Sequence, residues 1–317
     1  MRALGIILFA LSAAAASAQN EADVLMRIGQ EHFVRGELAT AEQAYLRLSA
    51  MSGYPEVVGV SGLVNILTVL GRPEEGLALF RQHAQKSGNL EFVAMAAFHL
   101  AQQNQTEAAR SELAPLVERL RQGGELNART LSVVAFTERR IGDFEPALAA
   151  ARQATDRFRA EGNARWKVMG RVTADILENL GRDLEASSEY ELQVNRAPDD
   201  APTLNDFALF LAVRGKQMDK ALGYSRHSLE LNPGDPLMLD TLGFILLKMG
   251  RADEAADTLV RAWRGRPNIT TVRAHLAQAL SKTANRSSLQ DLLDALQTEP
   301  TAANTSEINR LLAAAGR

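Results

Sequence analysis

Residues 239–263 read "LDTLGFILLKMGRADEAADTLVRAW", an apolar helical pattern that contains two glycines. Gly243 lies in the middle of the pattern, where a glycine costs roughly 0.5–1 kcal/mol relative to alanine. Gly250 follows after seven residues, Ala255 after five more and Leu259 after four more. This spacing predicts two helices joined by a left-handed turn at Gly250. Gly243 on the first helix and Ala255 on the second would then let the two helices approach closely, and the packing gained would outweigh the propensity lost.

The same spacing of a small residue, a turn residue, a second small residue and a fourth position recurs six times upstream. The sets are Gly29-Gly36-Ala41-Tyr45, Val64-Gly71-Gly76-Phe80, Ala97-Asn104-Ala109-Leu113, Ala135-Gly142-Ala147-Ala151, Ala174-Gly181-Ala186-Tyr190 and, with one extra residue in the turn, Ala208-Gly215-Ala221-Ser225. Asparagine replaces glycine in the third turn and is the next residue to tolerate a left-handed conformation. The repeats therefore have a period of about 34 residues, which is typical of helix–turn–helix repeats.

This arrangement resembles the tetratricopeptide repeat family. The repeat at 236–269 carries the family pattern most fully, in Leu242-Gly243, Leu246, Gly250, Ala255, Ala262 and Pro267. The resemblance implies an all-α fold, a right-handed superhelical solenoid of about seven to eight helix–turn–helix repeats. It also implies a groove lined by the first helix of each repeat, which in the family commonly holds an extended peptide or a partner helix. HEAT and armadillo repeats are longer, at about 40–47 residues, and pentatricopeptide repeats lack this glycine–alanine pattern.

The predicted organisation covers the whole chain. We expect a signal peptide at 1–18, a solenoid at 19–303 and a C-terminal capping helix at 304–317, because the open end of a solenoid must be covered. The expected repeats lie near 22–55, 57–90, 90–123, 128–161, 167–200, 201–235 and 236–269, followed by a degenerate one at 270–303.

The N-terminus predicts export. "MRALGIILFALSAAAASAQN" has one early arginine, an apolar run and the small-x-small pattern Ala16-Ser17-Ala18, as in a secretory signal peptide. The alternative, an uncleaved membrane anchor, is disfavoured because the run is shorter than the roughly 20 residues that a spanning helix needs. Arginine and alanine usage is typical of a GC-rich bacterial genome, so we expect a periplasmic location without stable membrane insertion after signal removal.

Composition and motifs favour a binding protein over an enzyme. The 317-residue chain has no cysteine and a formal net charge of −3, which disfavours thiolate chemistry and general nucleic-acid binding. The five histidines show no metal-ligand spacing, and no phosphate-binding glycine loop or G-x-S-x-G motif is found. We therefore expect no catalytic residues, no metal and no cofactor.

Candidate partner-binding positions follow from the register of the first helices. They are Phe98, Phe136, Arg139, Arg140, Arg171, Asn205, Asp240 and Phe244, with Asn65 and Arg129 also on the predicted groove. The arginines are expected on one side of the fourth and fifth repeats, where arginine binds carboxylates bidentately. This favours an acidic, partly apolar partner segment, although a solvated basic surface explains the same residues.

The sequence thus predicts a periplasmic protein–protein interaction scaffold, with a protein or peptide partner in the cell envelope. The stretch 204–263 is also similar to tetratricopeptide proteins of bacterial envelope systems, and this resemblance implies exopolysaccharide export or pilus or outer-membrane assembly as a setting. The alternative is direct binding of an anionic polysaccharide or other ligand. The partner and the oligomeric state stay open.

Export gives the first testable prediction. The mature protein should begin at Gln19, because the small-x-small pattern ends at Ala18. Intact mass spectrometry of the protein from an envelope fraction checks this; a retained Met1, or a purely cytosolic location, would contradict it.

Overall fold

The computed structural model describes residues 20–266 and 269–282. The chain divides into two bodies between Met169 and Gly170, and each body is described by itself. The predicted signal peptide, Pro267, residues 283–303 of the degenerate repeat and the capping helix at 304–317 lie outside the described residues.

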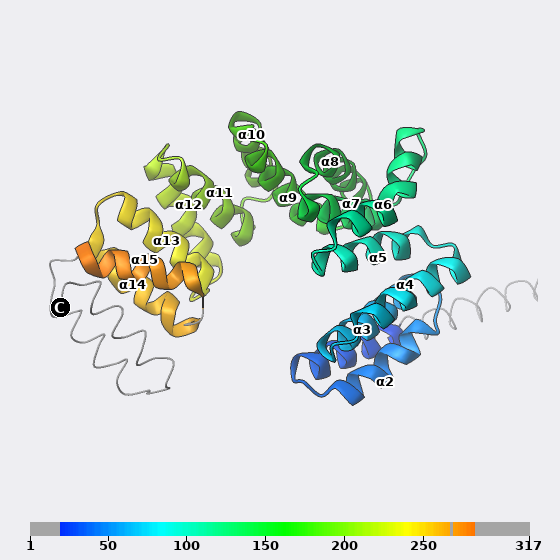
Figure 1. The fold of residues 1–317 in the computed structure, drawn as a ribbon. Helices are drawn as coiled ribbons and strands as arrows, with labels where there is room; N and C mark the ends of the chain where they lie inside the picture. Colours follow the sequence, from blue (N-terminus) through cyan, green and yellow to red (C-terminus); the bar gives the residue numbers. More distant parts are fainter. Residues whose placement is uncertain (1–19, 267–268, 283–317) are drawn as a thin grey trace, which may run out of the picture. The chain divides into compact units, whose positions relative to one another are not determined.

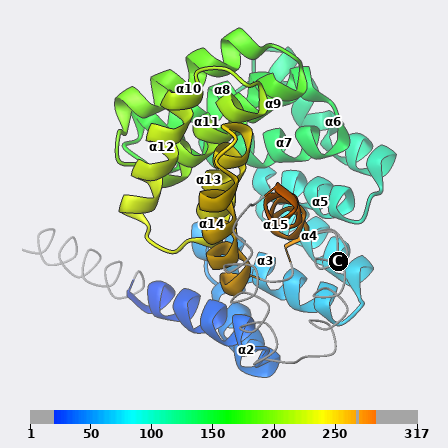
Figure 2. The same cartoon turned by 90° about the vertical axis from the view of Figure 1, so that its left-hand side faces the viewer.

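The N-terminal body, which ends at Met169, is a succession of helices (Figures 1 and 2), and from α2 to α8 each packs against the next. A first helix covers residues 20–34. It is followed by α2 (Leu38–Ser49), α3 (Tyr54–Val69), α4 (Pro73–Ser87), α5 (Leu90–Gln102), α6 (Thr106–Arg121), α7 (Ala128–Ile141), α8 (Phe144–Ala160) and the start of α9 (Arg165–Asn179).

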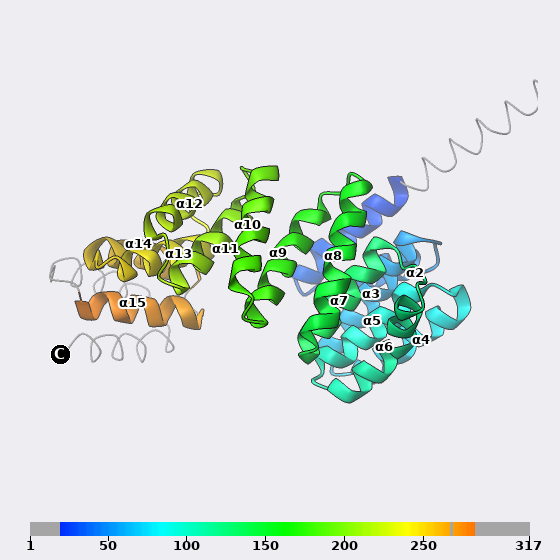
Figure 3. The same ribbon diagram turned by 90° about the horizontal axis from the view of Figure 1, so that it is seen from above.

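The C-terminal body continues from within α9 with the same alternation of helices and short turns. Its further helices are α10 (Asp183–Arg196), α11 (Ala201–Val213), α12 (Met218–Leu231), α13 (Pro236–Lys248), α14 (Ala252–Gly265) and α15 (Thr270–Lys282). Helix α15 lies against both α13 and α14 (Figure 3). Every regular element among the described residues is helical, which confirms the predicted all-α architecture of consecutive helix pairs.

The turns between paired helices follow the predicted pattern. The seven predicted turn residues have positive φ values between 59° and 88°, at Gly36, Gly71, Asn104, Gly142, Gly181, Gly215 and Gly250. Side chains with a Cβ rarely adopt this conformation, so these positions explain why the repeat keeps glycine or asparagine there. In the sixth turn the extra residue, Gln217, is also left-handed, with φ 48°.

In the first and seventh repeats, a close contact joins a large side chain on one helix to a glycine on the other. A Cβ at Gly243 would collide with the side chain of Leu259, so Leu259, rather than Ala255, is the residue that requires this glycine. Gly29 is matched to Tyr45 in the same way, at the same two repeat positions.

The second repeat reverses the sizes. Val64 occupies the first small position, and a Cβ at Gly76 would lie 2.8 Å from Val64 Cγ1. The glycine that departs from the alanine pattern therefore makes room for the larger valine. In these three repeats a larger side chain meets a glycine on the paired helix, although the pair of positions differs, and such size matching allows close packing.

The second small position is buried throughout. Its alanines, Ala41, Ala109, Ala147, Ala186, Ala221 and Ala255, have no exposed surface. Ala256, one residue around the helix from Ala255, is also buried. Helix α14 buries a wider face than the spacing alone indicates, since Thr258, Leu259, Ala262 and Trp263 are buried with it.

The starts of α13 and α14 carry residues that stabilise a helix N-terminus. Asp235 caps α13 by accepting hydrogen bonds from the backbone N–H groups of Leu237 and Met238, and Pro236 opens the helix. Asp253 and Glu254 occupy the first turn of α14, where the helix dipole favours negative charge.

The size matching gives a paired prediction on stability. Gly243→Ala should destabilise the fold by about 1–3 kcal/mol, because the new methyl group overpacks against Leu259. Gly223→Ala is the matched control: this helical glycine of α12 has open space around its Cβ position, so the change should stabilise by roughly 0.5–1 kcal/mol through helix propensity. Urea unfolding measures both. Equal effects of the two variants would contradict the packing described here.

A buried carboxyl group lies near the end of α7. Glu138 is 4% exposed and its Oε2 has no hydrogen-bond partner. Burial, with a smaller contribution from the charge of Asp143, raises the pKa of Glu138 to about 8. The acid is therefore largely protonated in the folded protein at neutral pH.

This pKa predicts a pH dependence of stability. Between about pH 4.5 and 8 the folded state holds a proton that the unfolded state has lost, so stability should fall as pH rises through this window, by up to about 1.4 kcal/mol per unit. Glu138→Gln should flatten the profile, whereas Glu107→Gln, at an exposed side chain, should leave it unchanged. Denaturant melts across this pH range provide the check, and a Glu138→Gln profile as steep as that of wild type would contradict the assignment.

Candidate partner-binding site

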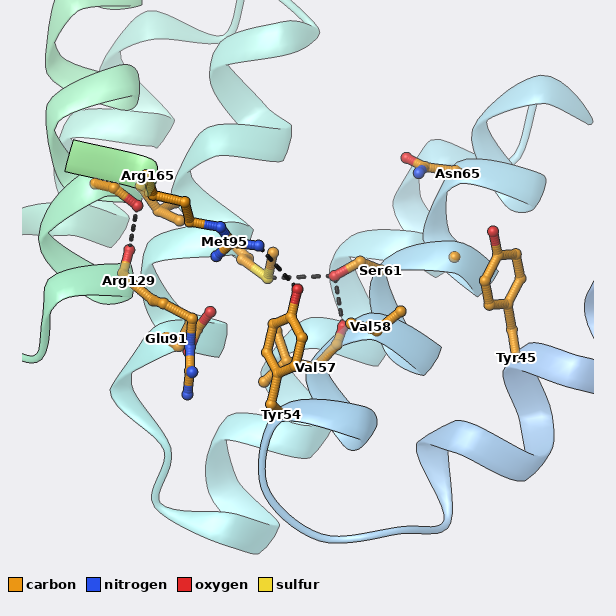
Figure 4. Close-up of a pocket in the computed structure, with 13 residues that line it drawn as sticks. Tyr45, Tyr54, Val57, Val58, Ser61, Asn65, Glu91, Met95, Arg129 and Arg165 are labelled. Atoms are coloured by element: carbon orange, nitrogen blue, oxygen red, sulfur yellow. Dashed lines mark hydrogen bonds and ion pairs between the residues drawn. The ribbon is translucent and has the colours of Figure 1, made fainter. Parts of the chain in front are cut away.

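A hollow of about 280 Å³ opens in the N-terminal body on the first helices of successive repeats (Figure 4). We call it the Tyr54 pocket. It is lined by Tyr45 of α2, by Tyr54, Val57, Val58, Ser61, Gly62 and Asn65 of α3, by Glu91 and Met95 of α5, by Arg129, Ser132 and Val133 of α7, and by Arg165 at the start of α9.

Helical periodicity gathers these residues. The α3 members recur at steps of three or four residues, from Tyr54 to Asn65, and the α7 members do the same from Arg129 to Val133. Such residues share one face of a helix. The pocket is therefore built from the corresponding face of four neighbouring first helices.

Two arginines surround Tyr54 at one end of the pocket (Figure 4). The guanidinium carbons of Arg129 and Arg165 lie over the Tyr54 ring, 4.8 and 5.6 Å from its centroid. Arg165 Nη2 donates to the Tyr54 hydroxyl at 2.9 Å, and Arg129 Nε donates to Glu91 Oε2 at 3.1 Å. The Glu91 side chain is only 4% exposed, so it acts as an internal anchor for Arg129.

Tyr45 and Asn65 mark the opposite end of the pocket in Figure 4. A Cβ at either Gly29 or Gly62 would collide with the Tyr45 ring. The two glycines, from neighbouring repeats, therefore make room for this ring. Burial raises the pKa of Tyr45 above its ordinary value, and the hydroxyl stays neutral. The same large-to-small contact that closes the first repeat thus also shapes the pocket.

The wall between the two ends is mostly apolar. Val57, Val58, Met95 and Val133 contribute side chains to it. The Ser61 hydroxyl donates to the Val57 carbonyl at 2.6 Å and lies 3.3 Å from Met95 Sδ. The Ser132 hydroxyl donates to the Arg129 carbonyl. Both serine hydroxyl protons are therefore used in hydrogen bonds within the protein, and the wall beside them is mostly apolar.

The sequence-predicted positions in the N-terminal body have mixed outcomes. Asn65 and Arg129 line the pocket. Phe98, Phe136 and Arg139 are half-buried on α5 and α7 and do not line it. Arg140 is exposed, and its Nε donates to the Ala101 carbonyl at 3.2 Å, an interaction that satisfies a carbonyl at the end of α5.

Most of the predicted positions in the C-terminal body already form ion pairs, hydrogen bonds or ring contacts within the protein. Arg171 pairs with Asp200 at 3.1 Å and with Asp206 at 3.3 Å, so its charge is already compensated within the protein. Burial raises the pKa of Asp206, and the charge of Arg171 opposes that shift. Asn205 is buried and its Oδ1 has no partner.

Asp240 and Phe244 share a partner on α15. His275 Nδ1 lies 2.8 Å from Asp240 Oδ1, and its ring packs at 4.8 Å from that of Phe244. Lys248 Nζ lies 5.3 Å from the Phe244 centroid. These contacts join α13 to α15, so the side chains predicted to face a partner also hold the two helices together.

The histidines have ordinary packing and hydrogen-bonding roles where their contacts are known. His83 pairs with Glu56 and His99 with the Pro73 carbonyl, each at 2.8 Å. Over residues 20–266 and 269–282, no three His, Asp or Glu side chains come together as metal ligands. In the same part of the chain, no helix has the length and apolarity to cross a membrane.

Three residues that line the pocket, Tyr54, Glu91 and Arg165, were not among the positions predicted from the sequence. They lie at the starts of α3, α5 and α9. The available signal was the helical period: counting back from the predicted Asn65 by about three turns of α3 reaches Tyr54 on the same face.

No protein-family model and no curated protein sequence matches the chain. Among solved structures, the thermophilic TPR protein TTC0263 of Thermus thermophilus is similar, with 23% identity and a TM-score of 0.45, over 59% of this chain and 98% of that one. MamA, from residue 41 to its end, of Desulfovibrio magneticus RS-1 matches with 14% identity and a TM-score of 0.43, over 60% and 97%.

The repeat itself identifies the fold. Helix pairs recur about every 34 residues, their turns are left-handed at the predicted positions, and the small residues at their contacts are buried. The described residues therefore have the helix–turn–helix repeat architecture that the resemblance to tetratricopeptide repeats implies.

Proposed function

We propose that this protein is an exported, periplasmic scaffold that holds an extended segment of a partner protein against the first helices of its N-terminal body. The observation that carries the proposal is the Tyr54 pocket, which combines two fixed arginines with an apolar wall. A scaffold of this kind suits the assembly of cell-envelope structures, such as pili or exopolysaccharide export systems.

The size of the pocket favours a protein segment. A hollow of about 280 Å³ is slightly smaller than typical small-molecule sites of roughly 300–1,000 Å³, and it suits one or two side chains. Its lining comes from four successive first helices.

The alternative ligand, an anionic polysaccharide, would use the same arginines. Sugar rings bind to the open face of an aromatic side chain, and Tyr54 is the aromatic ring at the charged end of the pocket. Two guanidinium groups already lie over that ring. We therefore favour a protein segment over a glycan.

Site-specific crosslinking tests the proposal. A photo-crosslinking amino acid at Ser132, which lines the pocket, should capture a discrete envelope protein in cells that produce both proteins. The same amino acid at Ser111, an exposed position of α6 in the same body, is the control and should not capture it. Ser132→Tyr fills the pocket, so it should reduce capture by a crosslinker placed at Asn65.

Mass spectrometry of the captured product identifies the partner and the crosslinked peptide. Equal capture from Ser132 and Ser111, or no reduction by Ser132→Tyr while the thermal melt stays that of wild type, would place the partner elsewhere on the protein and contradict the proposal.

A further inference from the structure

We propose that the Tyr54 pocket selects partner segments in which a side-chain carboxylate lies next to an aliphatic residue. This inference rests on the proposed function, because it names the chemistry of the segment that the same pocket would hold.

The charges of the pocket favour an anionic group. Its lining contains two cations, Arg129 and Arg165, and one carboxylate, Glu91, which leaves one positive charge. Glu91 occupies the Nε edge of Arg129, and the Tyr54 hydroxyl accepts from one terminal nitrogen of Arg165. A guanidinium has five N–H donors, so most donors of both groups remain available at the pocket.

The two guanidinium groups are also fixed in place. Each lies over the Tyr54 ring and is held at one edge by a second contact, to Glu91 or to the Tyr54 hydroxyl. Ordering a long side chain at an interface costs about 0.5–1.5 kcal/mol, and here the fold has already ordered both. A planar carboxylate can then bind bidentately with a small further loss of entropy.

The adjacent wall selects the neighbouring side chain. Val57, Val58, Met95 and Val133 form it, and the serine hydroxyls beside it donate inward to protein atoms. A polar side chain placed there would lose water without gaining donors from these serines. An aliphatic side chain loses nothing on leaving water and gains burial against the wall.

The pocket extends from the two arginines, on α7 and α9, across α5 and α3 to Tyr45 of α2. A segment that lies along it places a carboxylate at Tyr54 and the neighbouring side chain against the apolar wall. We assign the carboxylate to an Asp or Glu side chain, and peptides with blocked C-terminal ends distinguish it from a chain end.

Peptide display tests the inference. The full-length mature protein is panned against a library of random linear peptides whose C-terminal ends are fused and thus blocked. Peptides enriched by wild type should carry Asp or Glu beside Val, Leu or Ile. The pocket variant, Arg129→Gln with Arg165→Gln, should lose this preference and bind the best enriched peptide at least about tenfold more weakly.

A matched control has the same change in charge. Arg47→Gln with Arg121→Gln removes two exposed arginines of the same body that do not line the pocket. It should retain wild-type affinity. In the enriched peptide, replacing the acidic residue by its amide should weaken binding to wild type by a similar factor, and thermal melts confirm that each variant is folded.

The outcomes separate the two proposals. If wild type enriches no peptide, the proposed function fails, and direct binding of a uronic-acid oligosaccharide by wild type would support the glycan alternative. If wild type enriches peptides that lack an acidic residue, or if the pocket variant binds them as tightly as the control variant does, the carboxylate assignment is overturned while the scaffold function stands. Affinity that appears only with a free peptide C-terminus would also overturn the assignment to a side chain.

Discussion

The contact between a large side chain and a glycine, seen in three of the helix pairs, is the constraint on which the account of the structure rests. A repeat protein has no single central core, and each repeat contacts only its neighbours. The two helices of a repeat must therefore hold each other in a fixed geometry before the next repeat can stack. Gly243 against Leu259 and Gly29 against Tyr45 achieve this with the glycine on the first helix, and Val64 against Gly76 achieves it with the glycine on the second.

The geometry of the candidate site depends on these contacts between paired helices. Tyr54 and Arg165 lie 111 positions apart in the sequence, yet the arginine donates to the tyrosine hydroxyl. Glu91 and Arg129 bridge two further repeats in the same pocket. No single repeat contains the site, so the pocket forms only where several helix pairs stack in register. Binding by such a surface is sensitive to packing far from the ligand.

The fold followed from the sequence because its signals are local. Left-handed turns at Gly250 and Asn104 depend on one residue each, and the period of about 34 residues repeats them in register. The partner of Gly243 was not predicted correctly, because it depends on how the neighbouring helix face is rotated. The site is less predictable than the fold. Asn65 and Arg129 line the pocket, but a charge pattern does not reveal that Arg171 is already paired with Asp200 and Asp206 or that Arg140 binds a backbone carbonyl.

A double-mutant cycle at Val64 and Gly76 tests the size-matching claim most directly. Gly76→Ala alone should destabilise the protein by about 1–3 kcal/mol, because the added methyl group meets Val64. In the Val64→Ala background the same change should cost nothing, since the space is open and alanine favours the helix. The account therefore predicts a coupling free energy above about 1 kcal/mol between the two positions. Effects that add to within about 0.5 kcal/mol, as for independent sites, would contradict it.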